Sequence, residues 1–274
     1  MKKLEKEKLA GNLDRAIYYG FHLLVFSIPL TFIRISYDWF DLPKLTLLRI
    51  ETIIILSLWI LKGLLSNSLE IKRTKLDLPI LIFLVFSLIS TLTSVHLLTS
   101  LFGKYLRYEG LLTLANYALL FFLASQTFSD GKRIEAILRT MVITTSLVAL
   151  YGILQYLRFD FINWGMAPWE EGRSFSTLGN PVFLGGYLAL MLPIILGGYL
   201  SSRKPLANIL YGSAFLLSSA SVITTFSRGG WLASLIGLLV LAVLVGRKVF
   251  FSRKVGLIFL GLGMVFLLIL ISNY

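Results

Sequence analysis

Long apolar runs constrain the fold of this chain more than any other feature of its sequence. Nine of them lie near residues 16–36, 45–65, 78–98, 110–128, 136–157, 182–201, 206–225, 230–246 and 255–272. A helix needs about 20 apolar residues to cross a hydrocarbon core of about 30 Å. Inside lipid, each segment must also satisfy its own backbone hydrogen bonds, which favours helices here. The sequence predicts an all-α, polytopic membrane bundle with nine transmembrane helices, forming one membrane domain over residues 1–274.

The composition excludes most other classes of protein. Hydrophobic residues make up 57% of the chain and charged residues 15%, whereas a soluble domain carries about 25% charged residues. The chain has no cysteine, so it has neither a disulfide framework nor a thiolate metal site. Residues 1–15 form a charged N-terminal segment. No small-residue cleavage site follows the first run, so we expect a retained helix and not a signal peptide.

Lysine and arginine predict the orientation of the helices. With the N-terminus inside, 18 of the 26 basic residues fall on the inner side, while the 14 acidic residues divide evenly. This excess predicts a cytoplasmic N-terminus and an outer C-terminus. We interpret the net charge of +12 as this topology signal together with attraction to anionic membrane lipid, and we expect no nucleic-acid partner. Eight basic residues remain outside: Arg34, Lys44, Arg49, Lys104, Arg107, Arg158, Arg173 and Arg228.

The longest outer loop covers residues 158–181 and ends in "EEGRSFSTLGNP". Trp164 and Trp169 suit a headgroup interface. Asn180 followed by Pro181 predicts a capped helix start, whose N–H groups and partial positive charge suit a phosphate. Arg173 adds a planar, always-charged group. The sequence therefore predicts an anion site here, although a capped helix with an interfacial arginine explains the same residues.

A second outer turn, "TTFSRGGWLASL", lies between the seventh and eighth predicted spans. Ser227 can cap the next helix, and Arg228 stands at its start beside Gly229 and Gly230, where a ligand can approach the backbone. An interfacial hairpin whose arginine reaches the headgroups is the alternative. Since both arginines flank helix starts on one side, we expect Arg173 and Arg228 to share an outer-facing cavity.

The third outer connection, "LTSLFGKYLRYEGLL", mixes Lys104, Arg107 and Glu109 with tyrosines. This mixture suits sugar stacking or a belt at the headgroups. Arg49 and Glu51 lie inside the second predicted span, so we expect both to face protein or water and not lipid.

The remaining motifs give no support for a cofactor. Two histidines are present: His22 is expected to be packed in the first span, and His96 lies at the outer end of the third. The sequence contains no HExxH, paired-carboxylate, P-loop or GxSxG motif. We expect neither a metal nor another cofactor.

Two of these segments together carry a resemblance. "GRSFSTLGNPVFLGGYLALMLP", followed two spans later by "FSRGGWLA", is similar to the O-antigen ligase and polymerase family. "YLRYEGLLTLANYALLFF" and "YGILQYLRFDFINWG" resemble one subgroup of that family. The likeness covers residues 80–246 in the same order.

The resemblance implies a glycosyltransferase at the outer face of a bacterial inner membrane. Its donor would be a glycan linked to undecaprenyl diphosphate, and its acceptor a glycan, lipid or protein. It implies no metal, and it assigns diphosphate binding to Arg173 and Arg228. Asn180, Lys104 and Arg107 complete the predicted substrate-binding set.

One departure from the family concerns its essential histidine, which belongs to a long outer loop beyond the last helix seen here. His96 does not match it, so no catalytic residue is predicted, and we expect the chain to be a fragment. The alternatives are a polysaccharide polymerase of the same family, a transporter, and a non-catalytic membrane scaffold. A transporter would carry discontinuous helices in two matching halves and an ionisable coupling residue near the midplane, whereas this sequence shows no repeat and few charges at that depth.

Overall fold

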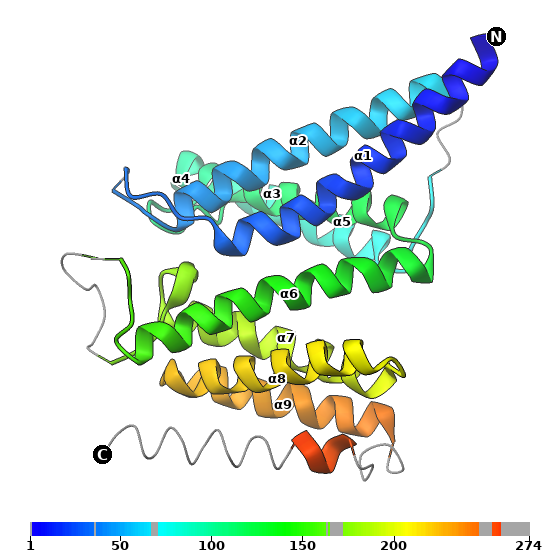
Figure 1. The fold of residues 1–274 in the computed structure, drawn as a ribbon. Helices are drawn as coiled ribbons and strands as arrows, with labels where there is room; N and C mark the ends of the chain where they lie inside the picture. Colours follow the sequence, from blue (N-terminus) through cyan, green and yellow to red (C-terminus); the bar gives the residue numbers. More distant parts are fainter. Residues whose placement is uncertain are drawn as a thin grey trace. The chain divides into compact units, whose positions relative to one another are not determined.

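The computed structural model describes residues 2–35, 37–66, 71–162, 164, 172–246 and 254–258. Within these ranges every regular element is a helix (Figure 1). The chain divides into two compact units, Met1–Ile137 and Leu138–Tyr274. The prediction of a single membrane domain stays a prediction, and the two units are described separately.

The first unit is built on an antiparallel pair of long helices, α1 (Lys2–Leu30) and α2 (Asp41–Ser66). It continues with α3 (Asp77–Leu92), the short α4 (Leu97–Phe102) and α5 (Leu111–Thr127), and it includes the first turns of α6 (Gly131–Tyr156). Its core is a cluster of four buried side chains from α1, α2 and α5: Ile17, Phe21, Ile55 and Leu123.

Polar contacts mark one end of the first unit. The carboxylate of Asp14 on α1 pairs with Lys62 near the end of α2 and with Arg133 at the start of α6. Lys72 donates from its ammonium group to the Ser129 hydroxyl at 2.7 Å. At the other end, the rings of Tyr37 and Tyr105 stack, with centroids 6.4 Å apart. These contacts bring the segments predicted to be cytoplasmic to one end of this unit, and the orientation itself stays a prediction.

The second unit packs the rest of α6 with η1 (Ser176–Leu178), α7 (Pro181–Ser201), α8 (Pro205–Thr224) and α9 (Arg228–Val245). Figure 1 shows α7, α8 and α9 side by side. Its largest fully buried side chains include Leu184, Leu188, Ile195 and Phe215. Because a side chain at Gly198 would collide with the Tyr211 ring, this glycine lets α8 approach α7 closely.

In the part of the chain that the structure describes, four helices, α6, α7, α8 and α9, are long and apolar enough to cross a membrane. The chain is therefore a helical, multi-pass membrane protein. Two shorter apolar helices, α3 and α5, add to them. In α2, three charged residues, Arg49, Glu51 and Lys62, interrupt the apolar run. The count of nine spans stays a prediction.

The predicted span 78–98 is not continuous. Helix α3 ends at Leu92 and α4 begins at Leu97. The hydroxyl of Thr93 donates to the Ile89 carbonyl at 3.0 Å, and the hydroxyl of Ser94 accepts the backbone N–H of His96 at 3.2 Å. Such side-chain bonds give the backbone partners outside the helix, which explains the break.

Some sequence predictions fall outside the described residues. They include Trp169, the inner residues Arg247, Lys248 and Arg253, and most of the ninth predicted span. Of that span, only residues 255–258 are described, and they are helical.

Candidate functional site

The segment that carries Arg173 is bound to the end of α8. The Nε of Arg173 donates to the carbonyl of Thr225 at 3.0 Å. The next residue, Ser174, donates its backbone N–H to the Thr224 carbonyl at 3.1 Å, and the two side-chain hydroxyls lie 2.7 Å apart. These bonds fix the direction of a partly buried guanidinium group.

A second set of bonds holds the same segment against the end of α6. The side-chain oxygen of Gln155 accepts the backbone N–H groups of Phe175 at 3.3 Å and Ser176 at 2.6 Å. Ser176 adopts φ +53° and donates its hydroxyl to the Val148 carbonyl at 2.7 Å. A left-handed conformation is unfavourable for a residue with a side chain, so these bonds are needed to hold it.

Asp160 fixes the side chain of Gln155 by a hydrogen bond. Its carboxylate accepts from the Gln155 amide at 3.1 Å, the Tyr151 hydroxyl at 2.8 Å and the Trp164 indole at 2.7 Å. Trp164 is buried and its ring meets Phe175, with centroids 5.3 Å apart. The Trp164 indole is thus bonded inside the protein, and the suitability of Trp164 for a headgroup interface stays a prediction.

The starts of α7 and α9 touch through two glycines. A Cβ at Gly230 would lie 2.9 Å from the Cα of Gly185 and 3.1 Å from its carbonyl carbon. A Cβ at Gly237 would lie 3.3 Å from Pro193, further along the same pair of helices. The two helices therefore run parallel, and their N-termini lie at the same end of the unit.

Each helix start has the cap that the sequence predicts. The side chain of Asn180 accepts the N–H of Val182 at 2.8 Å, with Pro181 at the first helical position. The Ser227 hydroxyl accepts the N–H of Gly230 at 3.2 Å. At α9, the backbone N–H groups of Arg228 and Gly229 precede the first intrahelical bond, so they are donors of the kind that a helix start leaves unpaired.

The structure brings Arg173 and Arg228 to the same end of the second unit. Arg173 is bonded to Thr225, three residues before Arg228, and Arg228 is exposed at the start of α9. Space beside Gly229 is open, since a Cβ there would meet nothing within 4 Å. The shared cavity stays a prediction. Direct contacts nevertheless bring Arg173 close to the start of α9, although 54 residues separate the two arginines in the sequence.

The other two predicted binding residues belong to the first unit. Lys104 and Arg107 are exposed in the turn between α4 and α5, where the Lys104 carbonyl accepts the N–H groups of Arg107 and Tyr108 at 2.9 Å each. His96 is exposed at the start of α4, and His22 packs on Tyr18 with ring centroids 4.5 Å apart.

Arg49 and Glu51 of α2 face protein, as expected. Arg49 donates to the Thr113 hydroxyl on α5 at 3.2 Å. The buried Glu51 accepts from the Ser27 hydroxyl on α1 at 3.0 Å.

The first turn of α2 has perturbed electrostatics. Burial lowers the pKa of Lys44 to about 8, although the carboxylates of Asp41 and Asp38 act in the opposite direction. The Lys44 ammonium donates to the Thr31 carbonyl at 2.6 Å. Burial, reinforced by Asp38, raises the pKa of Asp41.

Sequence reasoning missed the residues that hold the Arg173 segment, chiefly Gln155, Asp160, Thr224 and Thr225. A polar residue near the end of a predicted span, followed by a lone aspartate among aromatic residues, was the available signal for Gln155 and Asp160. Nothing in the local sequence indicates the partners of the two threonines. Among the described residues, no cluster of three or more histidine or acidic side chains is arranged to hold a metal.

No family model, curated protein or solved structure matches the chain. The likeness to the O-antigen ligase and polymerase family therefore rests on the sequence motifs alone.

Proposed function

We propose that this protein binds a glycan linked to undecaprenyl diphosphate and serves its transfer to an acceptor, as a membrane glycosyltransferase of the O-antigen ligase type. The observation that carries the proposal is that the segment before α7 and the start of α9 lie together. Arg173 donates to the carbonyl of Thr225, three residues before Arg228, and α7 contacts α9 at Gly185 and Gly230. The quoted motifs of the resemblance contain these same residues.

The chemistry of a diphosphate fits such a place. A diphosphate carries several negative charges and only acceptor oxygens, so it needs cations and N–H donors. Helix N-termini supply donors and partial positive charge, and arginine supplies a fixed, planar fork. In a transfer reaction the diphosphate is the leaving group, and groups that stabilise its developing charge accelerate the reaction.

The start of α9 offers more backbone N–H donors to a ligand than the start of α7 does. At α7 the first position is proline and the next N–H is taken by the Asn180 cap. At α9 the N–H groups of Arg228 and Gly229 come before the capped N–H of Gly230. We therefore assign the diphosphate to the start of α9 and to Arg173, with Asn180 fixing the neighbouring helix.

The proposal includes the topology and location. Nine spans, with the N-terminus in the cytoplasm and the C-terminus outside, follow from the excess of basic residues on the inner side. This arrangement puts Arg173 and Arg228 at the outer face of a bacterial inner membrane. Glycans assembled on the polyprenyl carrier would be presented at that face.

The experiment measures binding of a short-chain polyprenyl diphosphate to the purified full chain. A hydrogen bond to a charged group contributes about 1.5–3 kcal/mol, so the loss of one or two such bonds in Arg173→Ala should weaken binding on the order of 10- to 1,000-fold. Arg173→Lys should restore only part of the affinity, because an ammonium group lacks the planar fork. Arg228→Ala should weaken binding in the same direction.

Arg203→Ala is the matched control, since Arg203 is an exposed arginine in the turn between α7 and α8. It should bind the diphosphate like the unmodified protein. Thermal unfolding of each variant separates loss of binding from loss of the bond between Arg173 and Thr225. If Arg173→Ala and Arg228→Ala are folded and bind with unchanged affinity, the two arginines are interfacial residues and the proposal fails.

A further inference from the structure

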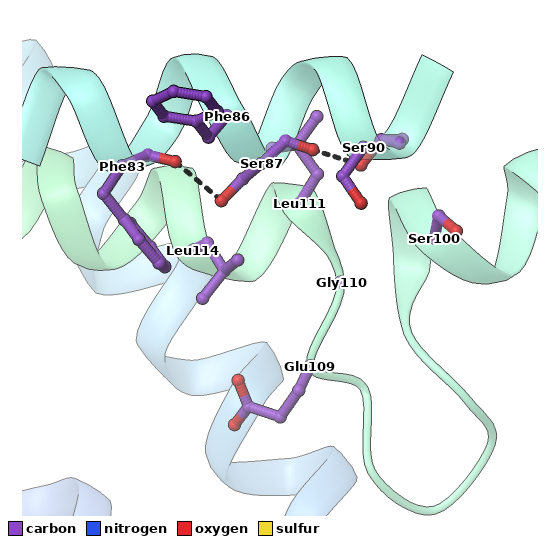
Figure 2. Close-up of a pocket in the computed structure, with 10 residues that line it drawn as sticks. Phe83, Phe86, Ser87, Ser90, Ser100, Glu109, Gly110, Leu111 and Leu114 are labelled. Atoms are coloured by element: carbon purple, nitrogen blue, oxygen red, sulfur yellow. Dashed lines mark hydrogen bonds between the residues drawn. The ribbon is translucent and has the colours of Figure 1, made fainter. Parts of the chain in front are cut away.

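A separate pocket lies in the first unit, among α3, α4 and the start of α5 (Figure 2). Its volume is 420 Å³, within the range of about 300–1,000 Å³ that is usual for ligand pockets. Its lining includes two aromatic rings, four hydroxyl groups and one acidic residue: Phe83, Phe86, Ser87, Ser90, Thr91, Ser100 and Glu109.

Three of the four hydroxyl groups of this pocket use their protons inside the protein. Ser87 donates to the Phe83 carbonyl at 2.8 Å, and Thr91 donates to the Ser87 carbonyl at 2.8 Å, as the dashed lines in Figure 2 mark. Ser100 donates to the Ser94 hydroxyl at 2.6 Å. A hydroxyl has one proton and two lone pairs, so these three groups can offer a ligand only acceptor positions.

Glu109 adds to the same polarity. Its Oε1 accepts from the Tyr117 hydroxyl at 3.2 Å, and a carboxylate is itself an acceptor. The pocket therefore suits a ligand that brings hydrogen-bond donors. An ionised phosphate has only acceptor oxygens and carries the same sign of charge as the Glu109 carboxylate, so it does not match the pocket.

Apolar surface completes the pocket. The residues Phe83 and Phe86 are 56% and 68% exposed, and Leu111 and Leu114 of α5 lie across from α3 (Figure 2). A ligand for this pocket must therefore combine several donors with an apolar face. A sugar ring has this combination, since its hydroxyl groups radiate from the edge and its C–H groups cover the faces.

We propose that the pocket between α3, α4 and α5 binds a sugar ring, from a glycan or a glycolipid, with Glu109 and Ser87 accepting its hydroxyl groups and the phenylalanine rings packing on its C–H face. The site is distinct from the arginine site, and it stands or falls without diphosphate binding. It gives the first unit a carbohydrate-binding role of its own.

The test is saturation-transfer NMR with methyl β-glucoside and the full chain in phosphatidylcholine nanodiscs. Sugar-based detergents are left out, because they would compete for the pocket. We expect saturation of the ring hydrogens in the unmodified protein. Ser87→Ala removes a neutral acceptor and should weaken binding about 2- to 10-fold, and Glu109→Gln should weaken it about tenfold or more.

Ser57→Ala is the matched control. Ser57 on α2 makes the same bond to the carbonyl four residues earlier, also at 2.8 Å, but it does not line the pocket. It should leave the affinity for methyl β-glucoside unchanged. If Ser87→Ala and Glu109→Gln both bind methyl β-glucoside with the affinity of the unmodified protein, the proposal is overturned. Binding of methylammonium in place of the sugar, or of inorganic phosphate at this pocket, would also overturn it.

Discussion

Adding one methyl group at Gly230 should separate the two helix starts that carry the proposed diphosphate site. In Gly230→Ala the new Cβ would lie 2.9, 3.1 and 3.3 Å from the Cα, carbonyl carbon and carbonyl oxygen of Gly185. All three are backbone atoms of α7, so no side-chain rotation can relieve the overlap. The start of α9 must move, or α7 must.

The neighbouring residue provides a matched control. Gly229 lies in the same first turn of α9, but a Cβ there would meet nothing within 4 Å. Replacing glycine by alanine in a helix stabilises it by roughly 0.5–1 kcal/mol, and this gain is shared by both variants. It cancels in the comparison, which leaves the steric cost at Gly230. Overpacking of this kind costs about 1–3 kcal/mol, so Gly230→Ala should be less stable than Gly229→Ala by that amount.

The assay is unfolding of both variants in mixed micelles titrated with dodecyl sulfate, together with affinity for a short-chain polyprenyl diphosphate. Gly229→Ala should unfold at the same or higher denaturant than the unmodified protein, and Gly230→Ala at lower denaturant. Equal stability of the two variants would refute the close backbone contact between α7 and α9. Unchanged diphosphate affinity in a destabilised Gly230→Ala would refute its link to the proposed site.

Three further predictions concern the first unit and the topology. Asp14→Asn removes the carboxylate shared by two basic side chains and should destabilise the protein by about 1–2 kcal/mol at pH 7, measured against the exposed control Glu7→Gln. Burial by itself raises the pKa of Asp14, but the bonds from Arg133 and Lys62 outweigh burial and lower the pKa below 3.8. The stabilisation from this carboxylate should therefore be lost only as the pH falls below 3.8. Burial lowers the pKa of Lys44 from 10.5 to about 8, so between these pH values Lys44 is protonated in the unfolded chain and largely neutral in the folded one. The free energy of unfolding should therefore rise with pH across this window, and the rise should be absent in Lys44→Met. Cysteines can be introduced one at a time, since the chain has none; in intact cells an impermeant thiol reagent should label Lys104→Cys and not Lys72→Cys, and the reverse pattern would contradict the predicted orientation.

The sequence by itself determined the helical class and most helix positions. Apolar runs specify where a chain in lipid must be helical, because no water is present to satisfy the backbone. Local signals were equally direct at the starts of α7 and α9: Asn180, Pro181 and Ser227 act within two or three residues of themselves, and the structure has both caps. The break after Leu92 was missed, since the hydroxyl bonds of Thr93 and Ser94 compete with a helix that their apolar neighbours favour.

Only the tertiary structure decided which distant residues support one another. Gln155 holds the Phe175 and Ser176 backbone across about twenty residues, and Thr225 receives Arg173 across fifty-two. Gly185 and Gly230 are recognisable from the sequence as small residues, but not as partners. Periodicity reports which side of a helix is apolar, while the choice of neighbour depends on steric fit between whole helices and on hydrogen bonds made after they pack. For the same reason the pocket between α3, α4 and α5 has no counterpart in any local motif: its hydrogen-bonding capacity depends on which hydroxyl protons the fold already uses.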